Sequence, residues 1–288
     1  MKYLFLFLLI TGIVKAQEIP SRWDELTTSD WQKALDKSAK TCILPIGILE
    51  KHGPHSPLGT DLIHVRDIAA LAVKNEYAVT FPDYFYGQIN EARQLPGTFA
   101  LPSDLIYKLL EATCDEIARN GFEKIVILNG HGGNPEFLRF FMQSQLNKRK
   151  NYAVYFVTAE NDAAFNKSLT AMRKTPAQQD LHAGESETSI LLHLRPELMK
   201  METATKESGE NLKRSNLPAN VYTPIWWFSS YPNHYAGEGA KATKEVGKFI
   251  VDFETASFSK ALKAIKADTK TIEIQNKYYD QVDQLLKK

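Results

Sequence analysis

Short apolar runs alternate with amphipathic segments over most of this 288-residue chain. The runs that have the length and composition of buried strands are 42–48, 78–81, 124–128 and 152–157. The segments with apolar positions at helical spacing are 28–37, 64–75, 103–120, 137–147 and 241–267. This alternation predicts an α/β fold with a largely parallel sheet.

Two further segments have no such pattern. Residues 203–220 are polar and are predicted to form a surface loop near the mouth of a site. Residues 278–288 are predicted to form a short terminal helix or a frayed tail. We see no linker that would divide the chain, so residues 17–288 are expected to form a single domain.

Residues 1–16 have the layout of a secretory signal peptide. Lys2 supplies a positive start, an apolar run follows, and Val14-Lys15-Ala16 offers small or aliphatic residues for cleavage. A membrane-spanning helix needs about 20 apolar residues, so an uncleaved anchor is the less favoured alternative. We therefore expect an exported protein, periplasmic or secreted, that is free of the membrane after cleavage.

The charge balance argues against nucleic acid as a partner. Without residues 1–16 the chain loses Lys2 and Lys15, which leaves 33 basic against 34 acidic residues. Nucleic-acid-binding proteins carry basic patches, so a small molecule or a peptide is the expected partner. Cys42 and Cys114 could form a disulfide in an exported protein. Both lie in apolar segments, however, which favours two separate buried thiols.

Three candidate ligands follow the first predicted strand. Glu50 and His52 are two residues apart, and such residues point the same way in an extended segment. Asp61 follows a Gly-Thr turn and precedes a predicted helix. All three side chains are therefore expected near the same edge of the sheet.

His131 directly follows the clearest predicted strand. In open α/β sheets, sites lie beyond the carboxyl ends of the strands. Gly130, Gly132 and Gly133 would let the backbone turn sharply and approach a ligand closely. No Lys-Ser or Lys-Thr pair follows, so a phosphate-binding P-loop fits poorly.

His182 and Glu187 are the third group of candidates. Glu187 opens an apolar run that is typical of a buried helix, where an unpaired charge would be costly. Taken singly, each candidate has an ordinary structural explanation, because a buried His is usually hydrogen-bonded and a loop Asp usually caps a helix. Together, three His and three carboxylates give the composition of a metal site.

The three motifs together resemble those of the creatininase family. The resemblance rests on PIGxxEKHGPHxPLGTD at 45–61, NGHGGN at 129–134 and HAGxxETS at 182–189. Weaker family features lie at 96–98 and 237–247, so the similarity covers roughly residues 22–255. It implies a three-layer α/β/α sandwich with a mostly parallel central sheet.

The resemblance also implies a site with two divalent ions, zinc or manganese, with iron as an alternative. It assigns Glu50 and His131 to one ion and His52 to the other, with Asp61 as the bridge. A water or hydroxide shared by the ions would be the nucleophile. The target would be a non-peptide C–N bond in a small-molecule amide, either cyclic or of the formamide type. The resemblance further implies a homo-oligomer, commonly a hexamer.

The sequence departs from creatininase itself at one ligand position. Gly133 stands where creatininase has a metal-ligating Glu. Glu187 is expected to supply the missing carboxylate, with Glu185 as the alternative.

A second departure concerns the Trp that precedes the His-Ala-Gly motif in creatininase. This chain has Gln178 and Gln179 in that stretch. Trp226 and Trp227 could take over the covering role, but packing in the core is the favoured interpretation. The natural substrate therefore stays open.

His182 is the expected catalytic proton donor to the leaving nitrogen, because an unperturbed imidazole titrates near neutral pH. Four residues are expected to support the ligands or contact substrate: His55, Gly132, Gly133 and Asn134. We expect His55 to orient a ligand carboxylate. One alternative is a dinuclear hydrolase of another bond, such as a phosphoester. Lys51 is the only basic residue near the ligands that could bind the phosphate of such a substrate. The other is a secreted metal-binding protein without catalysis.

Overall fold

The computed structural model describes residues 18–218 and 220–285. The strands within them are β1 (Thr41–Ile46), β2 (Val79–Thr80), β3 (Lys124–Asn129) and β4 (Ala153–Val157). The α-helices are α1 (Trp31–Lys37), α2 (Thr60–Asn75), α3 (Ser103–Arg119), α4 (Pro135–Ser144), α5 (Ala163–Met172), α6 (Glu185–Leu194), α7 (Trp226–Ser230), α8 (Lys244–Ala267) and α9 (Lys270–Asp283). Short 3-10 helices lie at Trp23–Glu25, Asn90–Ala92, Gln145–Asn147, Ala177–Gln179, Pro196–Leu198, Met201–Thr203 and Gly239–Lys241. The predicted signal peptide lies outside the described residues.

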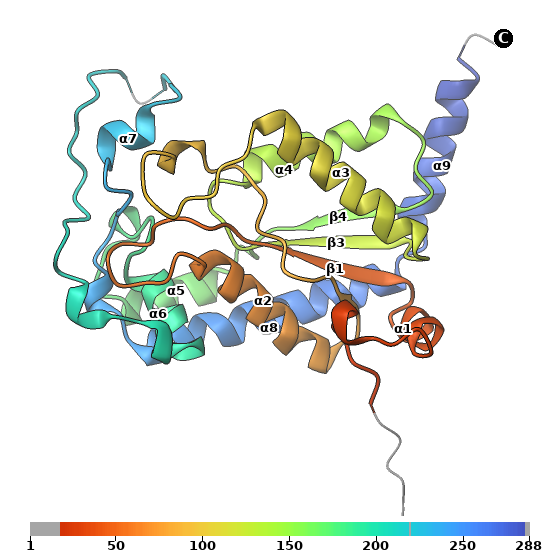
Figure 1. Cartoon of the computed structure of the whole chain (residues 1–288), viewed down its shortest axis with the longest axis horizontal. Coiled ribbons are helices and arrows are strands. Elements are labelled where there is room, and N and C mark those ends of the chain that lie inside the picture. The colour runs from red at the N-terminus through yellow and green to blue at the C-terminus, as the bar shows by residue number, and fades with distance from the viewer. Residues whose placement is uncertain (1–17, 219, 286–288) are drawn as a thin grey trace, which may run out of the picture.

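The strands form one parallel sheet in the order β2-β1-β3-β4. β1 and β3 lie at its centre and pair from Thr41 with Lys124 to Ile46 with Asn129. Figure 1 shows this sheet between two layers of helices. The predicted parallel α/β sandwich is thus confirmed. Because parallel strands end at the same edge of a sheet, the segments that follow β1 and β3 meet there.

Successive residues of the central strands pack into opposite layers. Cys42, Leu44 and Ile46 of β1 belong to the core that includes residues of α1, α3 and α4. Ile43 and, on β3, Val126 belong to the core on the other face, with α2, α6 and α8. Burial on both faces explains why these strands are continuous apolar runs.

The two cysteines are separate buried thiols, as their apolar surroundings predict. Cys42 and Cys114 are both free and lie in the same core. Burial raises the pKa of each thiol. Neither therefore has the thiolate character that a nucleophile requires.

Several helices differ from the sequence-based prediction, and α7 was not predicted at all. α2 begins at Thr60 instead of residue 64, which puts Asp61 in its first turn. α5 was not predicted; it packs Phe165 and Leu169 against the core but buries no residue fully. The predicted terminal helix at 278–288 is wrong in its start, since α9 begins at Lys270.

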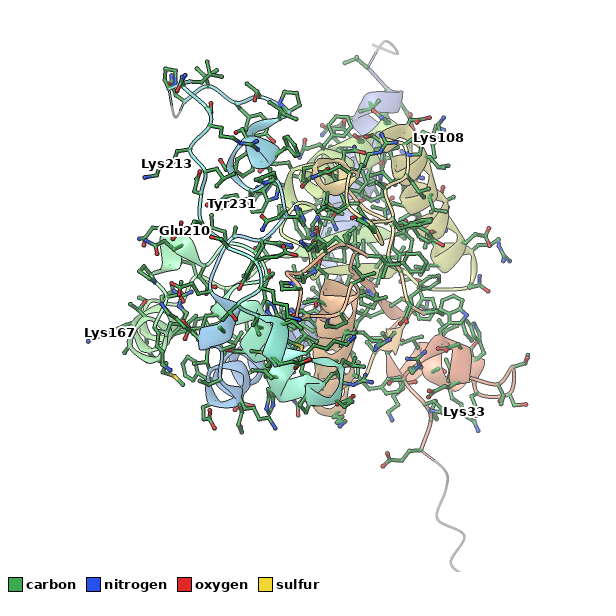
Figure 2. All side chains as sticks on the ribbon, turned by 60° about the vertical axis from the view of Figure 1, so that its left-hand side comes forward. Lys33, Lys108, Lys167, Glu210, Lys213 and Tyr231 are labelled. Atoms are coloured by element: carbon green, nitrogen blue, oxygen red, sulfur yellow. The ribbon has the colours of Figure 1, made fainter. Side chains whose placement is uncertain are left out.

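The segment 205–225, which we name the strap, runs between the helices that follow α6 and the start of α7. Most of its described residues are exposed, which confirms the predicted surface loop. Figure 1 shows the strap and α7 standing out at one side of the molecule, and Figure 2 labels Glu210 and Lys213 on it. Within residues 18–218 and 220–285, no helix combines the length and apolar character needed to cross a membrane.

Candidate metal centre

Four predicted ligands lie together beyond the ends of β1 and β3. Glu50 and His52 come from the segment after β1, Asp61 from the first turn of α2, and His131 from the loop after β3. All four are buried, and none exceeds 5% exposure. The topology of the parallel sheet therefore brings two distant sequence motifs to one place.

Asp61 lies between two imidazoles. Its Oδ1 is 3.0 Å from His52 Nε2, and its Oδ2 is 3.0 Å from His131 Nδ1. Glu50 Oε1 is 2.9 Å from the same His131 nitrogen. One carboxylate oxygen thus faces each imidazole, which is the arrangement that a bridging ligand needs.

Backbone carbonyls fix the tautomers of three histidines. Each ring donates a hydrogen bond from one nitrogen. His52 Nδ1 donates to Glu50 O at 3.3 Å, and His131 Nε2 donates to Gln88 O at 2.9 Å. His182 Nε2 donates to Lys51 O at 2.8 Å. A carbonyl only accepts, so in the neutral ring the other nitrogen carries a lone pair. For His52 and His131 that lone pair faces carboxylates. Metal-binding histidines are normally oriented in this way.

The buried carboxylates of this cluster create a negative environment that favours a bound cation. Burial alone would lower the pKa of His52, but Asp61, Glu50 and Glu187 raise it to about 10. Burial acts the same way on His131, whose pKa is nevertheless raised well above its usual value, chiefly by Glu50 and Asp61. With His131 neutral, Glu50 Oε1 and Asp61 Oδ2 are buried and have no hydrogen-bond donor among the described residues. A divalent cation would satisfy these atoms, so the residues fit a metal.

Glu187 and Glu185 have different surroundings, although both lie in the first turn of α6. Glu187 Oε2 is 3.8 Å from His52 Nε2 and accepts a hydrogen bond from Ala183 N at 2.6 Å. Glu185 is fully buried, and its carboxylate accepts from the backbone N–H groups of Lys174 and Thr175. Only Glu187 therefore points toward the proposed ligands.

His182 lies over His52, with the ring centroids 4.4 Å apart. Its Nδ1 is 3.9 Å from Glu187 Oε2. Burial lowers the pKa of His182, which keeps the ring neutral near pH 7. The Nδ1 lone pair is thus available to take up a proton beside the ligands.

Candidate ligand atoms of this region gather in three groups, within each of which they lie less than 4.8 Å apart. These groups are Glu50, Asp61 and His131; His52, His182 and Glu187; and Glu50, His182 and His234. The first two contain every residue that the sequence assigns to the metals or to proton transfer. The third contains His234, which the sequence analysis did not single out.

The predicted supporting residues surround the ligands in different ways. His55 Nε2 bonds the hydroxyl of Thr188 at 2.8 Å instead of a ligand carboxylate. Asn134 accepts from Gln88 N at 2.9 Å, which helps to hold the carbonyl that orients His131. A Cβ at Gly132 would meet no atom within 4 Å, so this glycine leaves open space.

Gly133 is closely surrounded. A Cβ there would lie 2.5 Å from His131 Nε2 and 3.1 Å from Glu91 Oε1. Burial raises the pKa of Glu91. Glu91 is thus a second residue, after His234, that the sequence analysis missed, and its carboxylate borders the space at position 133.

Trp227 is also part of this region. Its indole nitrogen donates to His234 Nδ1 at 2.7 Å, and its ring centroid lies 6.0 Å from that of His182. No residue of α7 is fully buried. This position corrects the favoured core-packing interpretation of Trp227 and fits a covering role better.

Comparison with known proteins agrees with the motifs. Residues 24–262 match the creatininase family, described as creatinine amidohydrolase. The mycofactocin precursor peptide peptidase of Mycolicibacterium smegmatis is 31% identical over 54% of this chain and 58% of its own length. The 3-dehydro-scyllo-inosose hydrolase of Thermotoga maritima is 26% identical over 75% of each chain. With the peptidase, the chain thus aligns over less than two thirds of the relative's length.

Solved structures share the fold. A creatinine amidohydrolase (creatininase) superposes with a TM-score of 0.73 at 20% identity, over 86% of this chain and 99% of its own. Creatininase structures include a zinc–zinc form and a manganese form. With the family match covering most of its length, this chain is a member of the creatininase family.

Proposed function

We propose that this protein is a dinuclear-metal amidohydrolase that cleaves a non-peptide C–N bond in a cyclic amide or a formamide-type substrate. The observation that carries the proposal is the position of Asp61, which presents one oxygen to His52 and the other to His131. The names of its relatives support hydrolysis as the reaction class, and one of them, a creatinine amidohydrolase, acts on an amide.

Glu50, Asp61 and His131 would hold one ion, and His52, Asp61 and Glu187 the other. Zinc and manganese are the proposed ions, because creatininase has been solved with each. Divalent ions at such a site act as Lewis acids and lower the pKa of bound water to about 7.

His182 is proposed to carry the proton of the reaction. Its Nε2–H is held by Lys51 O, so Nδ1 is the nitrogen that exchanges protons. Because burial keeps the ring neutral, Nδ1 first takes the proton of the attacking water and then donates it to the leaving nitrogen. Trp227, packed near His182, is proposed to shield this exchange from bulk water.

The first experiment measures metal content and hydrolysis in the same preparations. We expect about two divalent ions per chain in the parent protein and a large loss in Asp61→Ala. The matched control is Asp104→Ala, an exposed Asp in the first turn of α3, which should retain both ions. His182→Ala should also retain them but lose activity by about 10²–10⁴-fold. Full activity of this variant would remove His182 from the mechanism.

The substrate panel contains cyclic amides, formamides, short peptides and phosphoesters. Cleavage of an amide in the first two classes is the expected result. Turnover of peptides alone or phosphoesters alone would replace the proposed bond with that one. A parent protein that takes up neither zinc nor manganese would overturn the two-metal proposal.

We further propose export and self-association. The layout of residues 1–16 supports export. Amino-terminal sequencing of the exported protein tests cleavage, and a sequence that begins at Met1 would contradict it. Membership of the creatininase family supports a homo-oligomer, with the hexamer as the expected form.

A further inference from the structure

His234 makes hydrogen bonds of opposite direction to those of the other site histidines. Its Nδ1 accepts from the Trp227 indole N–H at 2.7 Å. The ring proton of a neutral His234 must therefore be on Nε2, which lies 2.5 Å from Glu50 Oε2. The neutral rings of His52, His131 and His182 direct a nitrogen lone pair toward the candidate ligands. The ring of His234 instead directs an N–H toward Glu50.

We propose that His234 is a positioning residue that orients the ligand carboxylate of Glu50 and is not itself a metal ligand. The inference rests on the proposed metal site. A ring whose Nε2 carries the proton cannot coordinate through that atom, and Nδ1 is already occupied by Trp227. The relay from Trp227 through His234 to Glu50 thus has one consistent direction of donation.

The two oxygens of Glu50 have separate partners. Oε2 receives the His234 N–H, while Oε1 lies 2.9 Å from His131 Nδ1 and has no donor among the described residues. Glu50 is fully buried. A single donor on Oε2 therefore fixes the rotation of the carboxylate and leaves Oε1 directed at the position of an ion.

The backbone that carries His234 is held against the Glu50 segment. Lys51 Nζ donates to Asn233 O at 2.9 Å and forms an ion pair with Glu207. Asn233 Nδ2 donates to the same Glu207 carboxylate at 3.2 Å. These contacts connect the residues next to His234 and Glu50 in sequence.

His234 also has a left-handed backbone conformation, with φ of 55°. A residue with a side chain adopts this region at a cost in backbone energy, and such residues concentrate at functional sites. The contacts of Lys51 and Glu207 with Asn233 hold the residue before His234 against the Glu50 segment and so help to maintain this conformation.

The test is the zinc affinity of the full-length metal-free protein, measured by competition with a chelating dye and without substrate. His234→Leu removes the donor and should weaken binding by about 10–100-fold, the usual effect of losing a partner of a metal ligand. His234→Gln places an amide N–H at a similar reach and should restore most of the affinity. His193→Leu, the same exchange on α6, is the matched control and should bind zinc like the parent.

A further variant, Trp227→Phe, tests the direction of the relay and does not depend on how His234 variants fold. Without the indole donor, the His234 ring is free to place its proton on Nδ1, so zinc affinity should fall. Equal weakening in His234→Gln and His234→Leu would overturn the proposal and make His234 a metal ligand beside Glu50, Asp61 and His131. Unchanged affinity in His234→Leu would overturn it as well, with the proposed function intact. A parent that binds no zinc would overturn both.

Discussion

Two glutamates at the start of α6 differ in function, although only Ser186 separates them. Glu185 receives N–H donors from Lys174 and Thr175 and is fully buried. Glu187 is 35% exposed in its side chain and reaches toward His52. Glu185 thus stabilises the segment before the His-Ala-Gly motif, whereas Glu187 lies beside His52 and is the proposed ligand.

The exchange of each carboxylate for an amide should separate these functions. Glu187→Gln is expected to lose one of two ions with little change in the free energy of unfolding. Glu185→Gln should retain both ions but lose about 1.5–3 kcal/mol of stability, because a hydrogen-bonded charge is replaced by a group that turns an N–H toward donors. Metal analysis and urea unfolding of both variants provide the measurements. Two ions in Glu187→Gln would contradict its assignment as a ligand.

The sequence could predict those site residues that lie in short motifs. The spacing of Glu50 and His52 and the position of His131 after a strand are local signals, and the structure brings these side chains together as expected. His234 and Glu91 have no comparable local pattern. They reach the site through folding of the segment after α7 and of the loop between β2 and α3, which no short-range spacing encodes. Their available signal was weak: His234 is one of seven histidines, in a segment rich in aromatic residues.

At the level of elements, α6 and α8 meet at very close range. A Cβ on Gly247 would lie 1.8 Å from the carbonyl oxygen of Ser189, a backbone atom that cannot move aside alone. Ser189 Oγ also accepts from Thr243 N at 3.0 Å, just before α8 begins. α8 thus holds the helix that carries Glu187 in place through direct backbone contact.

Gly247→Ala should therefore destabilise the protein by about 1–3 kcal/mol, since overpacking forces the two helices apart. Gly132→Ala is the matched control, because a Cβ at that position meets no atom within 4 Å. Urea unfolding of both variants gives the free energies. Gly247→Ala with the stability of the parent would contradict the rigid contact between α6 and α8.

Prediction of elements succeeded where apolar patterns were strong. β1 and β3 are buried on both faces, and α3 presents a buried stripe of Ile106, Leu110 and Ile117. α5 packs Phe165 and Leu169 only partly against the core, and α9 buries only Tyr279, so both helices have short apolar faces. α5 is instead capped by Asp162, which accepts from Phe165 N at 2.7 Å.

At the scale of the whole molecule, the strap and α7 carry apolar side chains that the single chain does not cover. Tyr222 is 79% exposed, Ile225 59% and Trp226 43%, and Leu212 and Leu217 on the same segment are also exposed. Figure 1 shows this region projecting from the side of the sandwich. Exposed apolar side chains gathered on one segment are typical of a protein contact surface. The strap is therefore the surface through which the proposed homo-oligomer would form.

Multi-angle light scattering of the purified protein should give a mass that is an integral multiple of the chain mass, with six copies expected. Ile225→Lys places a charge among the apolar side chains of the strap, so it should shift the population to smaller species. Phe140→Lys is the matched control, because Phe140 is 66% exposed on α4 and lies outside the strap. A monomeric parent would contradict self-association. Dissociation by Phe140→Lys and not by Ile225→Lys would move the contact surface from the strap to the α4 face of the sandwich.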